Sequence, residues 1–139
     1  MTQQLMDIAF SRRTDLALSA LRVLAMAEGR KSRKSLAREI GTTASFLPQV
    51  MSPLIKAGWV TSGRGPGGGY QLAESAFEAH LLDVVEATEG PTTSGRCVLR
   101  DGPCPGEESC PIHAIWVEAR RVLVEGFDVV PALDQGGNS

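Results

Sequence analysis

The fold is decided by three consecutive segments, Ser35-Leu-Ala-Arg-Glu-Ile-Gly41, then residues 42–57 (TTASFLPQVMSPLIKA), then Gly63-Arg-Gly-Pro-Gly-Gly-Gly69. The first predicts a short helix with apolar residues on one side, which its glycine ends. The second predicts a longer helix with polar positions left exposed. A short helix, a glycine and a longer helix form the pattern of a helix-turn-helix.

Threonines and prolines set the bounds expected for the longer helix. Thr42 or Thr43 can cap it, and Pro48, whose missing amide costs little in a first turn, places the start near Ser45. Pro53 should kink the helix or end it early. The stripe predicted to be buried comprises Phe46, Leu47, Val50, Met51, Leu54 and Ile55.

The glycine-rich segment lies between two short β-prone runs, residues 59–62 and 70–73. Two strands around such a tip predict a β-hairpin wing, which places Arg64 where the tip could enter a minor groove of DNA. A flexible turn is the plain alternative. A phosphate-cradling loop is excluded, because no Lys-Ser/Thr follows and the segment opens no helix.

Further helices are predicted over residues 11–28, 74–89 and 111–125. The last of these is long and strongly amphipathic for a domain of this size. It can form a dimer interface or pack back on its own domain, and the sequence does not separate the two. Its apolar stripe comprises Ile112, Ile115, Trp116, Ala119, Val122 and Leu123.

Length and composition indicate one domain of 139 residues, with 42% hydrophobic residues to build its core. We find no signal peptide and no apolar run of about 18 residues, so we expect a cytoplasmic protein with no membrane span. No arrangement of acid, base and nucleophile stands out, and His80 has no serine or cysteine in a useful pattern. An enzyme is therefore not expected.

Charge divides unevenly along the chain. Residues 1–72 carry ten Lys/Arg and four Asp/Glu, a net of +6, whereas residues 73–139 carry four and twelve, a net of −8. A basic first half suggests that this half meets a polyanion such as nucleic acid. The alternative is two solvated faces of one domain.

Soft metal ligands are concentrated in one stretch, with Cys97, Cys104, Cys110 and His113 separated by six, five and two residues. Cys110 precedes Pro111 and is expected to be the N-cap of the last helix, where the dipole favours a thiolate. Long gaps rich in glycine and proline suit an iron–sulfur cluster. Zinc, or three thiols without a metal, are the alternatives.

Five motifs together resemble the Rrf2 family of bacterial transcription regulators: RTDLAL at 13–18, LAREIG at 36–41, LIKAGWV at 54–60, RGPGGGY at 64–70, and the three-cysteine loop. The resemblance runs from about residue 11 to 127. It implies a mainly α fold with a small β-hairpin wing, namely a winged helix-turn-helix with a long C-terminal dimerisation helix. It assigns residues 1–80 to the DNA-binding domain and 81–139 to the cluster-binding loop (about 91–113) and dimerisation helix (about 111–126).

The resemblance also implies a set of cluster ligands. Cys97, Cys104 and Cys110 would bind iron. In IscR-like members a histidine three residues after the last cysteine completes a 2Fe–2S site, and His113 matches it. In NsrR-like members an aspartate in the first helix of the partner subunit completes a 4Fe–4S site, and Asp15 matches that. We favour His113; the first gap of six residues, where five is commoner, leaves the cluster geometry open.

The resemblance places the third helix in the major groove and the wing in the minor groove of a double-stranded operator. Thr43, Ser45 and Gln49 would face bases, with Arg64 and Gly65 at the wing. A homodimer would read a pseudo-palindrome. IscR-like members carry an acidic residue where this chain has Pro48, so operator preference would differ. The cations expected to contact phosphates are Arg12, Arg13, Arg33, Lys34, Arg38 and Lys56.

The predicted function is therefore a DNA-binding transcription regulator that senses redox, nitric oxide or iron–sulfur status. A zinc-stabilised DNA-binding module without sensing is the alternative. A small thiol-redox or electron-transfer protein is a further alternative, but it lacks a Cys-x-x-Cys pair and leaves the basic half unexplained.

Overall fold

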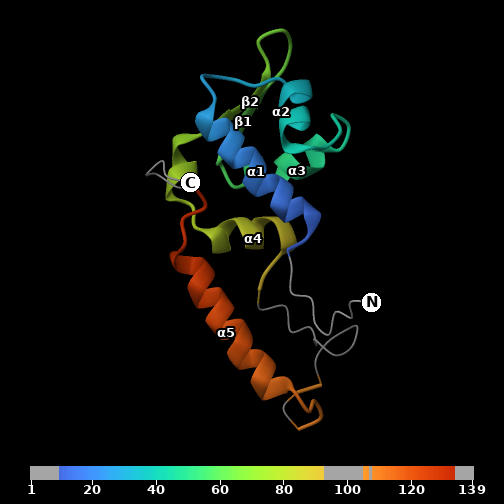
Figure 1. Cartoon of the computed structure of the whole chain (residues 1–139), viewed down its shortest axis with the longest axis vertical. Coiled ribbons are helices and arrows are strands. Elements are labelled where there is room, and N and C mark those ends of the chain that lie inside the picture. Colours follow the sequence, from blue (N-terminus) through green and yellow to red (C-terminus); the bar gives the residue numbers. More distant parts are fainter. Residues whose placement is uncertain (1–9, 93–104, 107, 134–139) are drawn as a thin grey trace, which may run out of the picture.

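The computed structural model describes residues 10–92, 105–106 and 108–133 (Figure 1). Its elements follow the predicted order, mainly helices with one antiparallel hairpin. In chain order they are α1 (Arg12–Met26), α2 (Arg33–Ile40), α3 (Leu47–Lys56), β1 (Val60–Gly63), β2 (Gly69–Leu72), the 3₁₀ helix η1 (Glu74–Glu78), α4 (Leu81–Glu89) and α5 (His113–Val129). The winged helix-turn-helix arrangement is thereby confirmed.

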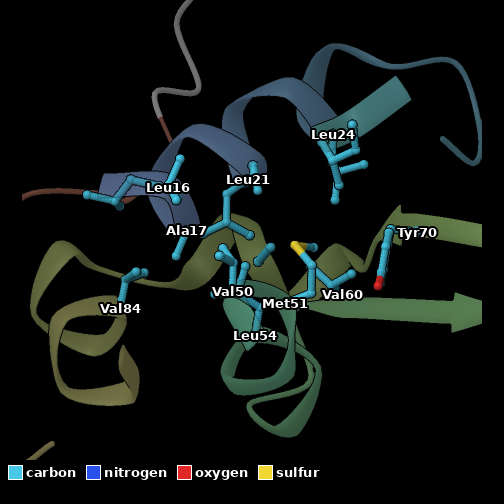
Figure 2. Packing of buried hydrophobic residues seen from close by; sticks show 14 of the residues in the cluster. Leu16, Ala17, Leu21, Leu24, Val50, Met51, Leu54, Val60, Tyr70 and Val84 are labelled. Atoms are coloured by element: carbon cyan, nitrogen blue, oxygen red, sulfur yellow. The ribbon is translucent and has the colours of Figure 1, made fainter. Parts of the chain in front are cut away.

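Helix α1 lies at the centre of the winged domain and packs on α2, α3, α4 and β2. Ser11 caps it by accepting a hydrogen bond from the Thr14 amide at 3.4 Å. Its apolar face meets α3 and the base of the wing in one core, which Figure 2 shows around Leu21, Met51 and Leu54. These three side chains are fully buried, so this core positions the DNA-binding elements.

The turn between α2 and α3 forms as predicted at Gly41, whose φ of 80° is the left-handed conformation that glycine adopts easily. Helix α3 begins at Leu47, slightly later than expected, with Pro48 in its first turn. Pro53 was expected to kink the helix or end it early; the early end was wrong, and the kink stays a prediction. Pro53 loses one amide bond, but α3 continues to Lys56, and the Ala57 amide still bonds the Pro53 carbonyl at 3.0 Å.

The wing is wider than the predicted hairpin. Strands β1 and β2 pair from Val60 with Leu72 to Gly63 with Gly69. The loop before α2 adds one rung, because Lys31 and Tyr70 exchange two backbone hydrogen bonds of 2.8 Å. Gly69 has a φ of 112°, and a Cβ there would overlap the Lys31 carbonyl oxygen. Only glycine allows this close approach of the two backbones.

The segment predicted as one helix over residues 74–89 is two elements, η1 and α4. The chain is extended at His80, which forms a capping box with Asp83 and starts α4 anew; the Asp83 carboxylate accepts from the His80 amide at 2.8 Å. Phe77, on the short 3₁₀ turn, is 38% exposed.

Helix α5 leaves the winged domain and extends beyond α4, as Figure 1 shows. It starts two residues later and ends four residues later than the range predicted, and none of its residues is buried. The chain then returns: Leu81 bonds the Val130 carbonyl at 2.7 Å, and Ala132 bonds the Ala79 carbonyl at 2.9 Å. Ala132 and Leu133 are buried in the core, a return segment that the sequence had not indicated.

No helix in the described part of the chain is long and apolar enough to cross a lipid bilayer.

Candidate nucleic-acid interface and ligand segment

The outer face of the helix-turn-helix carries the polar residues predicted to face DNA. Thr43, Ser45 and Gln49 are all exposed. Thr43 has a structural task as well, because its hydroxyl accepts from the Phe46 amide at 3.1 Å and lies 3.2 Å from the Ser45 hydroxyl. Gln49, in the first turn of α3, projects from the helix itself and has the amide group suited to reading a base edge.

Helix α3 presents one exposed polar line along its length. Gln49, Ser52 and Lys56 are exposed at spacings of three and four residues, while Val50 and Leu54 are buried behind them. Ser52 was missed in the sequence reading, although its helical spacing from Gln49 could have indicated it. Lys56 lies at the C-terminal end of this line, in the last turn of α3.

The tip of the wing is exposed from Thr61 to Gly67, including Arg64 and Gly65. A hollow of about 530 Å³ lies between the wing and the start of α2. Arg33 and Arg64 line it together with the hydroxyls of Ser32 and Ser62. The structure thus brings together two of the predicted DNA-contacting cations, which the sequence had placed far apart.

One of the predicted phosphate contacts has a structural task as well. Arg12 donates to the Gly41 carbonyl at 3.1 Å and so secures the turn between α2 and α3. Arg33, Lys34, Arg38 and Arg13 are exposed, as expected of phosphate contacts. These side chains surround the helix-turn-helix with positive charge.

We call residues 91–113 the cysteine segment; the structure describes 91–92, 105–106 and 108–113 of it. Cys97 and Cys104 lie outside the described residues. Cys110 is buried, at 5% exposure, and its amide bonds the Gly106 carbonyl at 3.0 Å. The expectation that Cys110 caps the last helix was wrong: Ile112 is the N-cap, and a turn separates the cysteine from α5. His113 is the first residue of α5, and its amide bonds the Cys110 carbonyl at 3.3 Å, so both side chains originate from one turn.

Asp15 lies elsewhere in the molecule. It is exposed in the first turn of α1, whereas His113 starts α5 at the end of that helix remote from α1 (Figure 1). Within residues 10–92, 105–106 and 108–133, no three potential ligands gather around one point. One chain therefore does not bring Asp15 beside His113.

A buried polar contact joins the start of α1 to the end of α4, just before the cysteine segment. The hydroxyls of Thr14 and Thr88 lie 2.6 Å apart, and Thr88 also lies 3.0 Å from the Val84 carbonyl. Beside them the Ser11 amide donates to the Glu89 carboxylate at 2.6 Å. We call Ser11, Thr14, Thr88 and Glu89 the α1–α4 junction. The sequence did not indicate this junction, because its two threonines lie within segments predicted as helices.

Helix α5 is tied to the beginning of the cysteine segment by one further contact. Arg120 donates to the Thr92 carbonyl at 2.8 Å, in a partly buried position. The ends of the segment are thus fixed by α4 on one side and α5 on the other.

A helix-turn-helix with an exposed polar recognition face, a two-stranded wing and surrounding cations defines a winged-helix regulator of the DNA-binding class. Residues 10–130 match the model of the Rrf2 family, described as iron-dependent transcriptional regulators. The chain therefore belongs to the Rrf2 family.

Two sequence relatives are HTH-type transcriptional regulators named IscR. That of Photorhabdus laumondii is 38% identical over 89 residues, 64% of this chain and 54% of the relative. That of Klebsiella pneumoniae is 40% identical over 87 residues, 63% of this chain and 52% of the relative. The chain spans about half the length of the curated relatives it matches.

Among solved structures, CymR, the global cysteine regulator of B. subtilis, is similar with a TM-score of 0.69 and 27% identity over 91% of this chain and 94% of that one. IscR of T. potens is similar with a TM-score of 0.66 and 25% identity, covering 91% of this chain and 85% of the other.

Proposed function

We propose that this chain is a homodimeric, cytoplasmic transcription regulator that binds a pseudo-palindromic operator and responds to an iron–sulfur cluster. The observation that carries the proposal is the union, in one chain, of a winged helix with an exposed recognition face and a cysteine segment that ends at Cys110 and His113. Its action is binding and release of DNA, with no catalytic step. DNA-binding and cluster-binding parts divide near residue 80.

DNA recognition rests on α3 and the wing. Gln49 has the geometry to bond adenine in the major groove, with Ser45 and Thr43 at the edge of the same face. Arg64 and Gly65 would enter the minor groove, where a glycine-rich tip fits closely. Arg13, Arg33, Lys34, Arg38 and Lys56 supply phosphate contacts that orient the protein without reading sequence.

The donor set fits an iron–sulfur cluster. Thiolates are the usual ligands of such clusters, and three cysteines lie within fourteen positions of the chain. Cys110 is buried beside the start of α5, where water has little access to its sulfur. The cluster, when bound, supplies a group that reacts with oxidants or nitric oxide. The chain's part is to hold it between α4 and α5.

We favour His113 as the fourth ligand, which suits a 2Fe–2S cluster, because it shares one turn with Cys110. Asp15 remains the alternative for a 4Fe–4S cluster. Since one chain does not bring Asp15 to His113, Asp15 would serve the cluster of the partner subunit, which its exposed position at the start of α1 permits.

The occupant proposed for α5 is the same helix of a second copy. Ile115, Val122 and Val129 are 71%, 55% and 74% exposed along this helix. Exposed apolar side chains repeated along a helix that buries none of its residues favour helix pairing. A two-fold dimer would present two α3 helices to successive major grooves.

Selection of duplexes from a random library by the purified chain tests the DNA function. We expect enrichment of a two-fold symmetric sequence, which the Gln49→Ala variant binds more weakly by about 1–3 kcal/mol with relaxed preference at one base pair. Lys34→Gln is the matched control, because a phosphate contact should weaken all sequences equally. Absence of any enriched sequence would refute the proposal.

The fourth ligand is tested by absorption and electron paramagnetic resonance spectra of protein purified without oxygen. His113→Ala should alter the spectrum, whereas Asp15→Ala should leave it unchanged. The opposite pattern would assign Asp15, and a colourless protein that contains zinc would favour the zinc-stabilised module.

A further inference from the structure

Arg30, between α1 and α2, takes a position that the sequence did not suggest. Its neighbour Lys31 pairs with Tyr70 and carries the loop alongside β2. A Cβ built on Gly63, at the end of β1, would lie 2.8 Å from Arg30 Nη1 and 3.4 Å from Cζ. The guanidinium of Arg30 therefore lies over the end of β1, in space that a side chain at position 63 would occupy.

Gly63 also lines the hollow between the wing and α2, together with Arg33 and Arg64. Arg30 therefore lies over a residue that shares this hollow with Arg33 and Arg64. Ser32 and Ser62 add hydroxyls to the lining, and no aspartate or glutamate is part of it. Lys31, the other cation nearby, is already paired with Glu39 at 2.5 Å.

None of these three arginines has a carboxylate partner within residues 10–92, 105–106 and 108–133. An arginine without a counter-charge favours the binding of an anion nearby. Guanidinium groups bind phosphate oxygens in a planar, two-point geometry, which makes phosphate the anion of choice. The open volume of about 530 Å³ leaves room for a phosphodiester.

We propose that Arg30 is a further DNA-contacting residue, which with Arg33 and Arg64 holds a backbone phosphate beside the groove that the wing enters, and that Gly63 is needed to leave Arg30 in place. This inference rests on the proposed DNA-binding function. The contact adds affinity and fixes the wing on the backbone, without reading sequence.

Binding of the full chain to the duplex enriched by selection, and to a random duplex of the same length, tests the contact. Arg30→Gln should weaken binding to both duplexes by about tenfold and lower the slope of log K against log salt by about 1 per chain. Arg22→Gln, which removes an exposed arginine of α1 that does not line this hollow, should change neither quantity. Arg30→Lys should recover part of the loss, since the charge remains but the two-point geometry does not.

Gly63→Ala tests the Arg30 contact independently, by displacing the Arg30 side chain. Only the flexible end of Arg30 has to move to admit the methyl group, so the fold should be retained, which far-UV circular dichroism and thermal unfolding would check. We expect a loss of affinity close to that of Arg30→Gln. In the Arg30→Gln background, Gly63→Ala should have no further effect, because the residue it displaces is already gone.

The outcomes separate the contact from the function on which it rests. If the unaltered chain enriches no duplex, the DNA-binding function fails and the contact with it. If the unaltered chain binds but Arg30→Gln binds equally well, the contact alone is overturned. The contact is also overturned if Gly63→Ala weakens binding as much without Arg30 as with it.

Discussion

The winged domain and helix α5 differ in how fully this single chain buries their apolar side chains. In the winged domain, α1, α3 and the wing enclose a core in which Leu21, Met51 and Leu54 have no exposed surface. In α5, 17 residues long, no side chain is buried, and Ile115 is 71% exposed. The apolar residues of the winged domain are thus buried within the chain, whereas the apolar residues of α5 stay exposed.

This difference indicates where the molecule depends on something outside the chain. The winged domain buries its own apolar side chains, with Ala132 and Leu133 of the return segment in the same core. Under the proposed function, helix α5 and the cysteine segment would instead gain their partners from a second copy and from a cluster, and would change without unfolding the rest. Such a division is suited to a sensor.

The largest expected effect compares two aliphatic truncations. Leu54→Ala should lower the free energy of unfolding by about 2–5 kcal/mol, because it opens a cavity in the core. Ile115→Ala should leave the unfolding of the winged domain almost unchanged and weaken dimerisation instead. Urea denaturation and sedimentation of both variants measure the two effects.

If Ile115→Ala destabilised the winged domain as strongly as Leu54→Ala, α5 would belong to the same core and the distinction drawn between the two regions would be wrong.

A second comparison tests how tightly the winged domain is closed. Gly69→Ala should cost about 3 kcal/mol or more, because the new methyl overlaps the Lys31 carbonyl and the residue has a positive φ. Gly67→Ala, in the same glycine run, should cost little, since a Cβ there has no atom within 4 Å. Thermal unfolding distinguishes them, and equal losses would contradict the close backbone approach at Gly69.

The α1–α4 junction lies where the two regions meet, and we expect a smaller effect there. Thr88→Val should cost about 1–2 kcal/mol, because Thr14 loses a buried hydroxyl partner. Adding Thr14→Val should cost less than the sum of the two single changes. Thr61→Val, at an exposed strand position, is the matched control. Fully additive losses would show that the two hydroxyls do not depend on each other.

The smallest effect concerns the exposed surface of α5. Arg121 bonds Glu118 and lies near it, and so lowers the pKa of the Glu118 carboxyl. In Arg121→Gln that pKa should rise to its ordinary value, as an NMR titration would show. A carboxyl with a lowered folded-state pKa adds stability above its unfolded pKa and loses it as pH falls through the folded value. The stability difference between variant and parent should therefore vanish at acidic pH.

Much of the winged domain could be predicted because its signals are local. Gly41 ends a helix and the run Gly63–Gly69 turns a hairpin by backbone conformation alone, and Pro48 marks a first turn. The return segment could not be predicted, since Ala132 and Leu133 form a short apolar run with no period. Its partner, Ala79, lies across the intervening α4, cysteine segment and α5.

In the candidate site, too, the sequence indicates residues with local signals and does not indicate those that depend on folding. Residue type and helical spacing indicate Gln49, Cys110 and His113 directly. Arg30 was missed because its place depends on Gly63, which meets it only after the wing has folded. Local spacing does not decide between Asp15 and His113, since in the proposed dimer that choice depends on how the two chains pair.

We propose that a cluster on the cysteine segment governs DNA binding, while the stability of the winged domain stays the same. The most direct measurement is the affinity of protein purified without oxygen for the duplex enriched by selection, before and after removal of the cluster, with iron and acid-labile sulfide determined on the same samples. We predict that iron and sulfide are bound, that affinity changes by about tenfold or more on their removal, and that the winged domain's thermal unfolding stays the same. Equal affinity with and without bound iron and sulfide, or protein that binds neither, would contradict the account.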